Sequence, residues 1–148
     1  MSGISGGRIL LVKLDAAAFV ADPELIHALH ERATPVDCTE DRVLFYQGEM
    51  ADGLYIVQAG NVALSMQSPL GDTVMSISAT PGSLLGLPGL VGNSAYSLTA
   101  KAANGAEIWF VGREQFSRLM LTEPSLSVMI LKVLAAEVRN ARQALAEI

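Results

Sequence analysis

An uncharged segment broken by glycines and prolines is the feature that most constrains how this chain can fold. From Thr73 to Ala100, twenty-eight residues contain no Asp, Glu, Lys, Arg or His. Such a segment is typical of a membrane span, a buried sheet or the wall of a pocket. A span needs about twenty predominantly apolar residues, whereas Pro81, Pro88 and Asn93, with several glycines, interrupt this run. The segment is therefore expected to form short buried strands and tight turns.

Composition limits the classes of function. The chain has 148 residues and a net charge of -5. Its length predicts one domain over residues 1–148, with a core large enough to be stable without disulfides or metal ions. Its basic residues are scattered, which argues against nonspecific nucleic-acid binding. The single cysteine excludes an intramolecular disulfide. Residues 1–7 are expected to form a flexible N-terminus without a secretory signal, so a cytoplasmic protein without membrane attachment is predicted.

Helical signals precede a middle region that is rich in strand signals. Asp22, Pro23 and Glu24 indicate a helix start, with an N-cap acceptor, a proline at the first position and a carboxylate near the positive end of the helix dipole. Between residues 34 and 111, short apolar runs alternate with Gly, Pro, Asn and Asp, which predicts an antiparallel sandwich or barrel. The expected strands are residues 43–45, 54–58, 61–66, 73–79, 97–102 and 106–111.

Residues 113–148 return to a helical period. A short helix is predicted from Arg113 to Leu121, and a long one from Pro124 to the end of the chain. Apolar residues on the long helix repeat at spacings of three and four, which favours a coiled-coil-like seam and a homodimer. Packing of this face on the chain's own barrel is the alternative. The seam consists of Leu131, Leu134, Val138, Ala141, Leu145 and Ile148.

Two further segments carry a resemblance to a known family. The segment QGEMADGLYIVQAGNV, residues 47–62, places two glycines at turn positions and an alternating LYIV run that should face a barrel interior. With FSRLMLTEPSLSVMILKVLAAEV, residues 116–138, it resembles the cyclic-nucleotide-binding domain family, which includes the effector domain of the catabolite activator protein. The resemblance implies a mainly β fold with flanking helices. It would be an antiparallel double-stranded β-helix (jelly-roll) barrel with an N-terminal helix and a long C-terminal helix.

In that family the uncharged segment corresponds to the phosphate-binding cassette. There, helix amides and an arginine hold the cyclic phosphate, and a glutamate accepts from the ribose hydroxyl. This chain has Leu87 at the glutamate position and Ser94 at the arginine position, so its cassette is degenerate. Losing the arginine costs on the order of a hundredfold in affinity. The candidate ligand-binding residues are Gly86, Leu87, Pro88, Gly89, Leu90, Ser94, Tyr96 and Ser97.

The resemblance implies a regulatory sensor module that binds a small-molecule effector in its barrel, with weak or lost affinity for cyclic AMP and cyclic GMP. An apolar lining would suit an aromatic or acyl effector instead. Tyr96 would either stack on a ligand ring or fill the core. The alternative is a ligand-free structural or interaction module that dimerises through its C-terminal helix. The residues expected to supply the apolar lining are Leu84, Leu85, Leu87, Leu90 and Val91.

Catalysis is not expected from this chain. It has neither a nucleophile elbow nor a phosphate-binding loop that ends in lysine. His27 and His30 are expected to be solvated helix residues, so no metal site is predicted. Transcription factors of the family carry a helix-turn-helix domain after the long helix. Because the chain ends at Ile148, neither such a domain nor direct DNA binding by this chain is expected.

Overall fold

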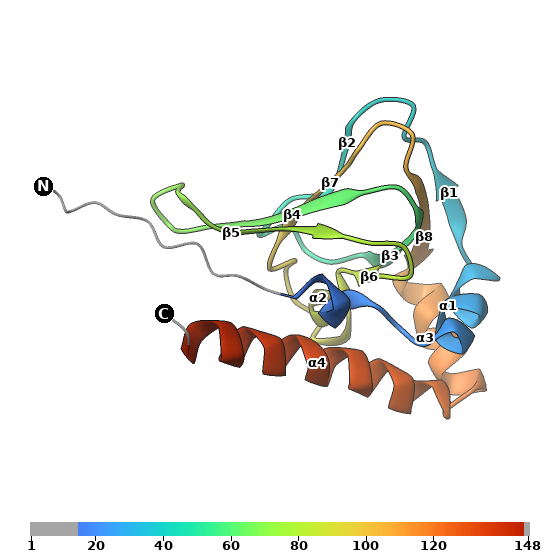
Figure 1. The fold of residues 1–148 in the computed structure, drawn as a ribbon. Coiled ribbons are helices and arrows are strands. Elements are labelled where there is room, and N and C mark those ends of the chain that lie inside the picture. Colours follow the sequence, from blue (N-terminus) through green and yellow to red (C-terminus); the bar gives the residue numbers. More distant parts are fainter. Residues whose placement is uncertain (1–14, 147–148) are drawn as a thin grey trace, which may run out of the picture.

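Two antiparallel sheets form the body of the protein (Figure 1). The computed structural model describes residues 15–146, so the flexible N-terminus expected at residues 1–7 lies outside them. The strand orders are β1-β8-β3-β6 and β2-β7-β4-β5. The strands are β1 Thr34–Val36, β2 Arg42–Phe45, β3 Gly53–Ala59, β4 Val62–Gln67, β5 Thr73–Ala79, β6 Leu84–Leu85, β7 Thr99–Ala102 and β8 Glu107–Gly112. The predicted mainly β jelly-roll architecture with flanking helices is confirmed.

Each of the six expected strands is present, and β5 has the predicted bounds. Sequence reasoning missed β1, and β6 was not among its six listed strands, because the two are only three and two residues long and show no alternation. Both lie at the edge of their sheet. That position tolerates Pro35 in β1, because an edge strand leaves one side of its backbone unpaired. Gly48 and Gly60 adopt the turn conformations expected of them, with φ of 93° and 85°.

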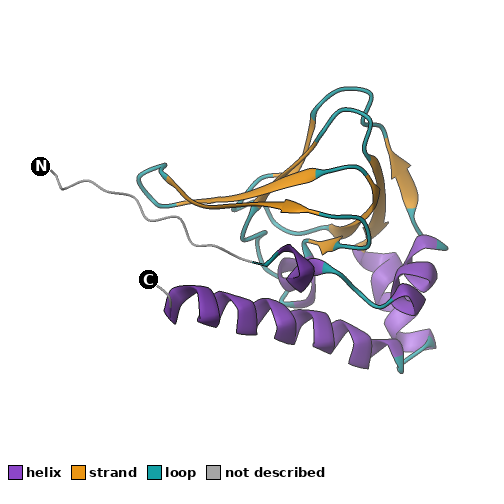
Figure 2. Cartoon of the chain, viewed as in Figure 1, coloured by secondary structure: helices purple, strands orange, loops and turns teal. Residues whose placement is uncertain are grey.

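The helices gather on one side of the sheets (Figure 2). Helix α1 begins as predicted, since the Asp22 carboxylate accepts a hydrogen bond from the Glu24 N–H at 2.9 Å. The predicted start of the long helix at Pro124 was wrong by two residues. Pro124 lies in a turn, and its carbonyl accepts from the Ser127 N–H at 3.0 Å. The helices are η1 Ala16–Phe19, a 3-10 turn, α1 Pro23–His30, α2 Leu87–Val91, α3 Arg113–Thr122 and α4 Leu126–Ala146.

Strand β3 is buried on both faces and separates two apolar cores. Leu54 and Ile56 belong to the core beneath the helices, whereas Val57 belongs to the core between the sheets. The predicted alternation of the LYIV run is confirmed, because Tyr55 and Val57 face the core between the sheets while Leu54 and Ile56 face the helices. Helices cover the outer face of this sheet, and a strand covered on both faces has no polar side.

The remaining helical features bear on two earlier expectations. His27 is exposed, while His30 packs edge-on against Trp109 with ring centroids 4.3 Å apart.

Among the described residues, no helix combines the length and apolar composition that a membrane crossing requires. Helix α4 runs beneath the barrel in Figure 1, and η1 contacts it from the barrel side.

Candidate ligand-binding site

The uncharged segment folds into strand β6, a tight turn and helix α2. Leu84 and Leu85 pair with β3, and Gly86 then starts α2 with a φ of 88°. A Cβ atom at Gly86 would lie 2.7 Å from Cε1 of Tyr96. Both the left-handed backbone and the close approach of the ring therefore require glycine here. The expectation of short buried strands and tight turns in this segment is confirmed.

A small cavity lies where this segment meets η1, the barrel and α4. Its volume, counted as space open to the centres of water-sized molecules, is about 20 Å³, which is room for roughly one or two waters. The side chains around it come from both sheets and from the helices that close the barrel. They are Phe19, Phe45, Leu64, Leu85, Gly86, Pro88, Gly89, Tyr96, Ser97, Leu98 and Glu137.

Five of the eight candidate ligand residues line this cavity, namely Gly86, Pro88, Gly89, Tyr96 and Ser97.

The structure places the other three elsewhere. Leu87 and Leu90 are 0% and 2% exposed and belong to the core beneath the helices. Ser94 is exposed, and its backbone N–H donates to the carbonyl of Gly89 at 2.9 Å. Of the residues expected to supply the apolar lining, Leu85 alone does so, because Leu84 also lies in the helical core and Val91 is exposed.

Tyr96 fills the core and forms one wall of the cavity. Its ring stacks on Phe45 with centroids 4.0 Å apart and an interplanar angle of 21°. Its hydroxyl donates to the Gly53 carbonyl at 2.7 Å and lies 3.1 Å from Oδ1 of Asp52. Burial, followed by the neighbouring Asp52 carboxylate, raises the pKa of the Tyr96 phenol. Tyr96 is therefore a neutral wall residue whose polar atom is already bonded within the protein.

The cassette lacks the basic side chains that would hold a phosphate. Within the described residues, the side chains around the cavity include no Lys, Arg or His. The guanidinium of Arg113 donates to the carbonyls of Leu90, at 3.1 Å, and Ala51, so it anchors the end of α2. At the start of α2, Pro88 has no N–H to offer, and the Leu90 N–H is bonded to the Gly86 carbonyl at 3.1 Å.

Glu137 of α4 is the cavity residue that sequence reasoning missed. Its Oε2 atom is buried and has no hydrogen-bond partner. Burial raises the pKa of this carboxyl from 4.5 to about 7, since it disfavours the charged form. Glu137 is the one acidic residue of α4, and it falls in register with the buried Ile130, Val133 and Ala144. An acid at an apolar register was the signal that could have found it.

Helix α4 and η1 close the barrel together. Asn140, one turn beyond Glu137, bonds the backbone of Asp15 twice: its Oδ1 accepts from the N–H and its Nδ2 donates to the carbonyl, each at 3.2 Å. Asp15 in turn caps η1 by accepting from the Ala17 N–H at 3.0 Å. This link holds η1, with Phe19 facing the cavity, against α4.

The opposite side of α4 is uncovered in the described chain. Leu131, Val138 and Leu145 are 63%, 51% and 61% exposed, whereas Leu134 and Ala141 are half-buried. Leu134 packs against the core beneath the helices, so only part of the predicted seam, namely Leu131, Val138 and Leu145, is left uncovered by the described chain. Its last member, Ile148, lies outside the described residues.

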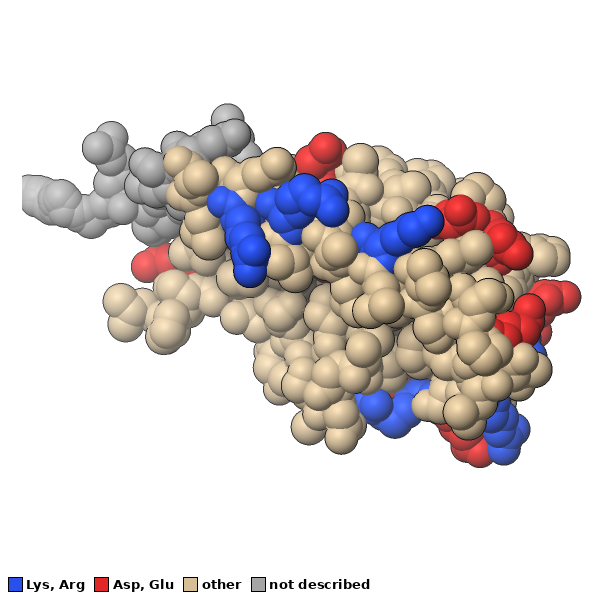
Figure 3. All heavy atoms as spheres, turned by 90° about the horizontal axis from the view of Figure 1, so that it is seen from below, with Lys and Arg blue, Asp and Glu red and all other residues tan. Residues whose placement is uncertain are grey.

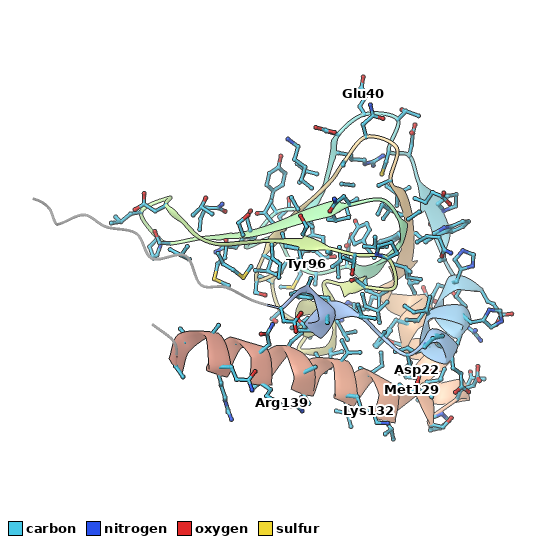
Figure 4. The ribbon with its side chains drawn as sticks, in the orientation of Figure 1. Asp22, Glu40, Tyr96, Met129, Lys132 and Arg139 are labelled. Carbon is cyan, nitrogen blue, oxygen red and sulfur yellow. The ribbon has the colours of Figure 1, made fainter. Side chains whose placement is uncertain are left out.

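Basic side chains follow the same uncovered side. Lys132, Arg139 and Arg142 of α4 are exposed, and Arg139 and Arg142 border a shallow groove together with Leu131 and Val138. Figure 3, seen from below, shows separate basic side chains on a largely uncharged surface. Figure 4 places Tyr96 within the barrel, whereas Lys132 and Arg139 lie along α4.

Two facing antiparallel sheets, a cassette-like turn and helix, and a long helix that closes the cavity define an effector domain of the double-stranded β-helix type. Residues 35–123 match the family model described as the cyclic nucleotide-binding domain. The chain belongs to this family.

Its relatives include bacterial regulators. The chain is 27% identical over 132 residues to a CRP-like cAMP-activated global transcriptional regulator of Mycobacterium tuberculosis, which covers 86% of this chain and 57% of the regulator. Its structure is similar to Thermus thermophilus catabolite activator protein, with a TM-score of 0.74 and 23% identity over 89% of this chain and 62% of that one. It is also similar to the sensor domain of the transcriptional regulator DNR from Pseudomonas aeruginosa, with a TM-score of 0.63 and 19% identity over 86% and 83%. The chain spans less than two-thirds of the length of the curated relatives it matches.

Proposed function

We propose that this domain is a sensor module that binds a small molecule in the cavity between the barrel and α4 and has weak or lost affinity for cyclic nucleotides. One observation carries the proposal: the cassette framework encloses a cavity whose only charged lining residue, within the described chain, is acidic. The family supplies the regulatory setting. The choice of ligand comes from the residues of this cavity.

The cavity itself favours a sensor over an empty scaffold. Protein interiors are close-packed, and buried polar atoms nearly always have partners. A barrel kept only as a scaffold would be expected to fill this space with apolar side chains. Here Glu137, which lines the space, keeps an unpartnered oxygen. A ligand that supplies the missing partner accounts for this feature.

The same cavity disfavours a cyclic nucleotide. The relative's printed name says that cyclic AMP activates it, and a cyclic phosphate carries a negative charge. In this chain that charge would meet Glu137 with no cation to balance it. Pro88 also removes an amide donor. An affinity lower by on the order of a hundredfold or more is expected relative to a cassette with arginine.

The test begins with a thermal-shift titration with cyclic AMP and cyclic GMP at millimolar concentration, since a ligand of the folded state raises the melting temperature by mass action. No shift is expected from either nucleotide. A saturable shift would overturn the proposed loss of nucleotide affinity.

The sensor role is then tested by ligand-observed NMR with a mixed fragment collection. Ser97→Trp blocks the cavity wall, and Ser94→Trp is the matched control at an exposed serine outside the cavity. Fragments should bind the unmodified protein and the Ser94 variant but not the Ser97 variant. Failure to find any such fragment would overturn the sensor proposal and favour the ligand-free structural module.

A second role, compatible with the first, is homodimerisation through the uncovered side of α4. The observation behind it is the exposed apolar stripe at helical spacing, since apolar stripes of this kind are the usual contact between paired helices. Arg142 lies within the groove beside Val138. Like charges meeting at this point would limit the strength of such a pair.

A further inference from the structure

The cavity reverses the charge that its family's cassette offers to a ligand. Glu137 projects from α4 into a space whose other lining side chains are uncharged, and no hydrogen bond reaches its Oε2 atom. A buried carboxylate oxygen without a partner is unfavourable, so the group normally neutralises or finds a counter-charge. Since Arg113 is bonded to carbonyls behind α2, it does not provide that counter-charge.

Aromatic side chains line the same cavity as this carboxylate. Phe45 and Tyr96 form a stacked pair on the barrel side, and Phe19 lines the cavity from η1. Aromatic rings attract cations through their quadrupole, and this attraction is stronger in a desolvated site. A carboxylate flanked by aromatic residues is complementary to a positively charged group and unfavourable for an anion.

The size of the cavity narrows the class of cation. Space for about one or two water-sized molecules accommodates an ammonium head group, which is close to a water molecule in size, but not a guanidinium with its substituents. Ser97 both lines the cavity and is exposed. Ser97 is therefore the place where a chain attached to the head group would be expected to reach solvent.

We propose that the cavity binds the ammonium head group of a primary-amine ligand, with the Glu137 carboxylate as its counter-ion. The inference rests on the proposed sensor function and deepens it by assigning the chemical class of the ligand.

Ionisation of the cavity is consistent with this assignment. Burial alone accounts for the raised pKa of Glu137, and the other ionisable group facing the cavity is the neutral Tyr96 phenol. A bound ammonium group would lower the pKa of Glu137, because it stabilises the ionised carboxylate.

The experiment compares three probes with one skeleton and different charges: phenethylamine, 2-phenylethanol and 3-phenylpropionate. Each is titrated into the whole chain by calorimetry at pH 8, with cyclic AMP as a fourth probe. Phenethylamine should bind at least tenfold more tightly than the alcohol or the carboxylate, because only it forms a charge-assisted pair. Glu137→Gln should abolish that preference. Glu123→Gln, at an exposed acid outside the cavity lining, should retain it.

The outcomes separate this inference from the sensor function. If 2-phenylethanol, 3-phenylpropionate or cyclic AMP binds as tightly as phenethylamine, the ammonium assignment is overturned while a sensor function stands. Retention of the amine preference in the Glu137 variant would also overturn the assignment. Absence of binding by all four probes, together with failure of the fragment screen, would remove both. The comparison of probes on the unmodified chain decides the question even if the variant does not fold.

Discussion

Replacing Glu137 by glutamine should remove a pH-dependent cost from the folding of this domain. The carboxyl has an ordinary pKa of 4.5, which burial raises to about 7 in the folded chain. The folded state therefore holds a proton that the unfolded state releases between these values. The favourable contribution is present below pH 4.5 and is lost as the pH rises through 7. Over this interval, at about 1.4 kcal/mol for each pH unit, the loss amounts to roughly 3 kcal/mol.

Urea denaturation at pH 4, 7 and 8.5 measures this cost. The free energy of unfolding of Glu137→Gln, relative to the unmodified chain, should rise by about 3 kcal/mol between pH 4 and pH 8.5. The difference cancels the titration of all other groups, as well as the constant effect of the amide. Glu123→Gln, at an exposed site, is the matched control for the change of acid to amide. A difference that does not change with pH for the Glu137 variant would refute the burial of this carboxylate.

Three further perturbations test the rest of the site. Leu131→Glu should convert a dimer into a monomer in size-exclusion chromatography with light scattering, whereas Leu121→Glu, at a more exposed leucine outside α4, should leave the mass unchanged; a monomeric unmodified chain would end the dimer proposal. Gly86→Ala combines a φ of 88° with a contact of 2.7 Å to the Tyr96 ring and should cost about 2–4 kcal/mol in urea unfolding. Gly105→Ala shares the positive φ but has open space around it, so a cost of about 1–2 kcal/mol is expected; equal costs would argue against the steric part of the reasoning. Tyr96→Phe leaves a buried carbonyl of β3 without its donor and should cost about 1–3 kcal/mol, and an unchanged midpoint would show that the bond contributes nothing.

Much of the fold follows from local chemistry. The start of α1 at Asp22 and Pro23 depends on capping groups that are adjacent in sequence, so it could be predicted without any tertiary contact. The turn at Gly48 and the strand β5 were predictable for the same reason. The start of α4 was not, because a proline suits both the first turn of a helix and a preceding turn.

Sequence reasoning located a segment that lines the cavity, but it did not identify all of the side chains around it. Gly86 and Tyr96 were predicted because turn glycines and aromatic residues stand out in an uncharged segment. Leu87 and Leu90 were assigned to the ligand site by family position, yet α2 directs both into the core beneath the helices. The side chains of a five-residue helix point in several directions. Which of them faces the core depends on the tertiary contacts that fix how the helix is rotated about its axis.

The sequence by itself determined the succession of a helix, a region of antiparallel strands and two C-terminal helices, since each of these depends on residue type and spacing along the chain. The jelly-roll class and the absence of an arginine from the cassette followed from its resemblance to a family. Only the tertiary structure decided which face of β3 meets the helices and which side of α4 remains uncovered. It also brought Glu137 to the stacked pair of Phe45 and Tyr96. The physical reason is that a cavity is formed by residues far apart in sequence. The charge that a ligand meets there is the sum of groups that only packing brings together.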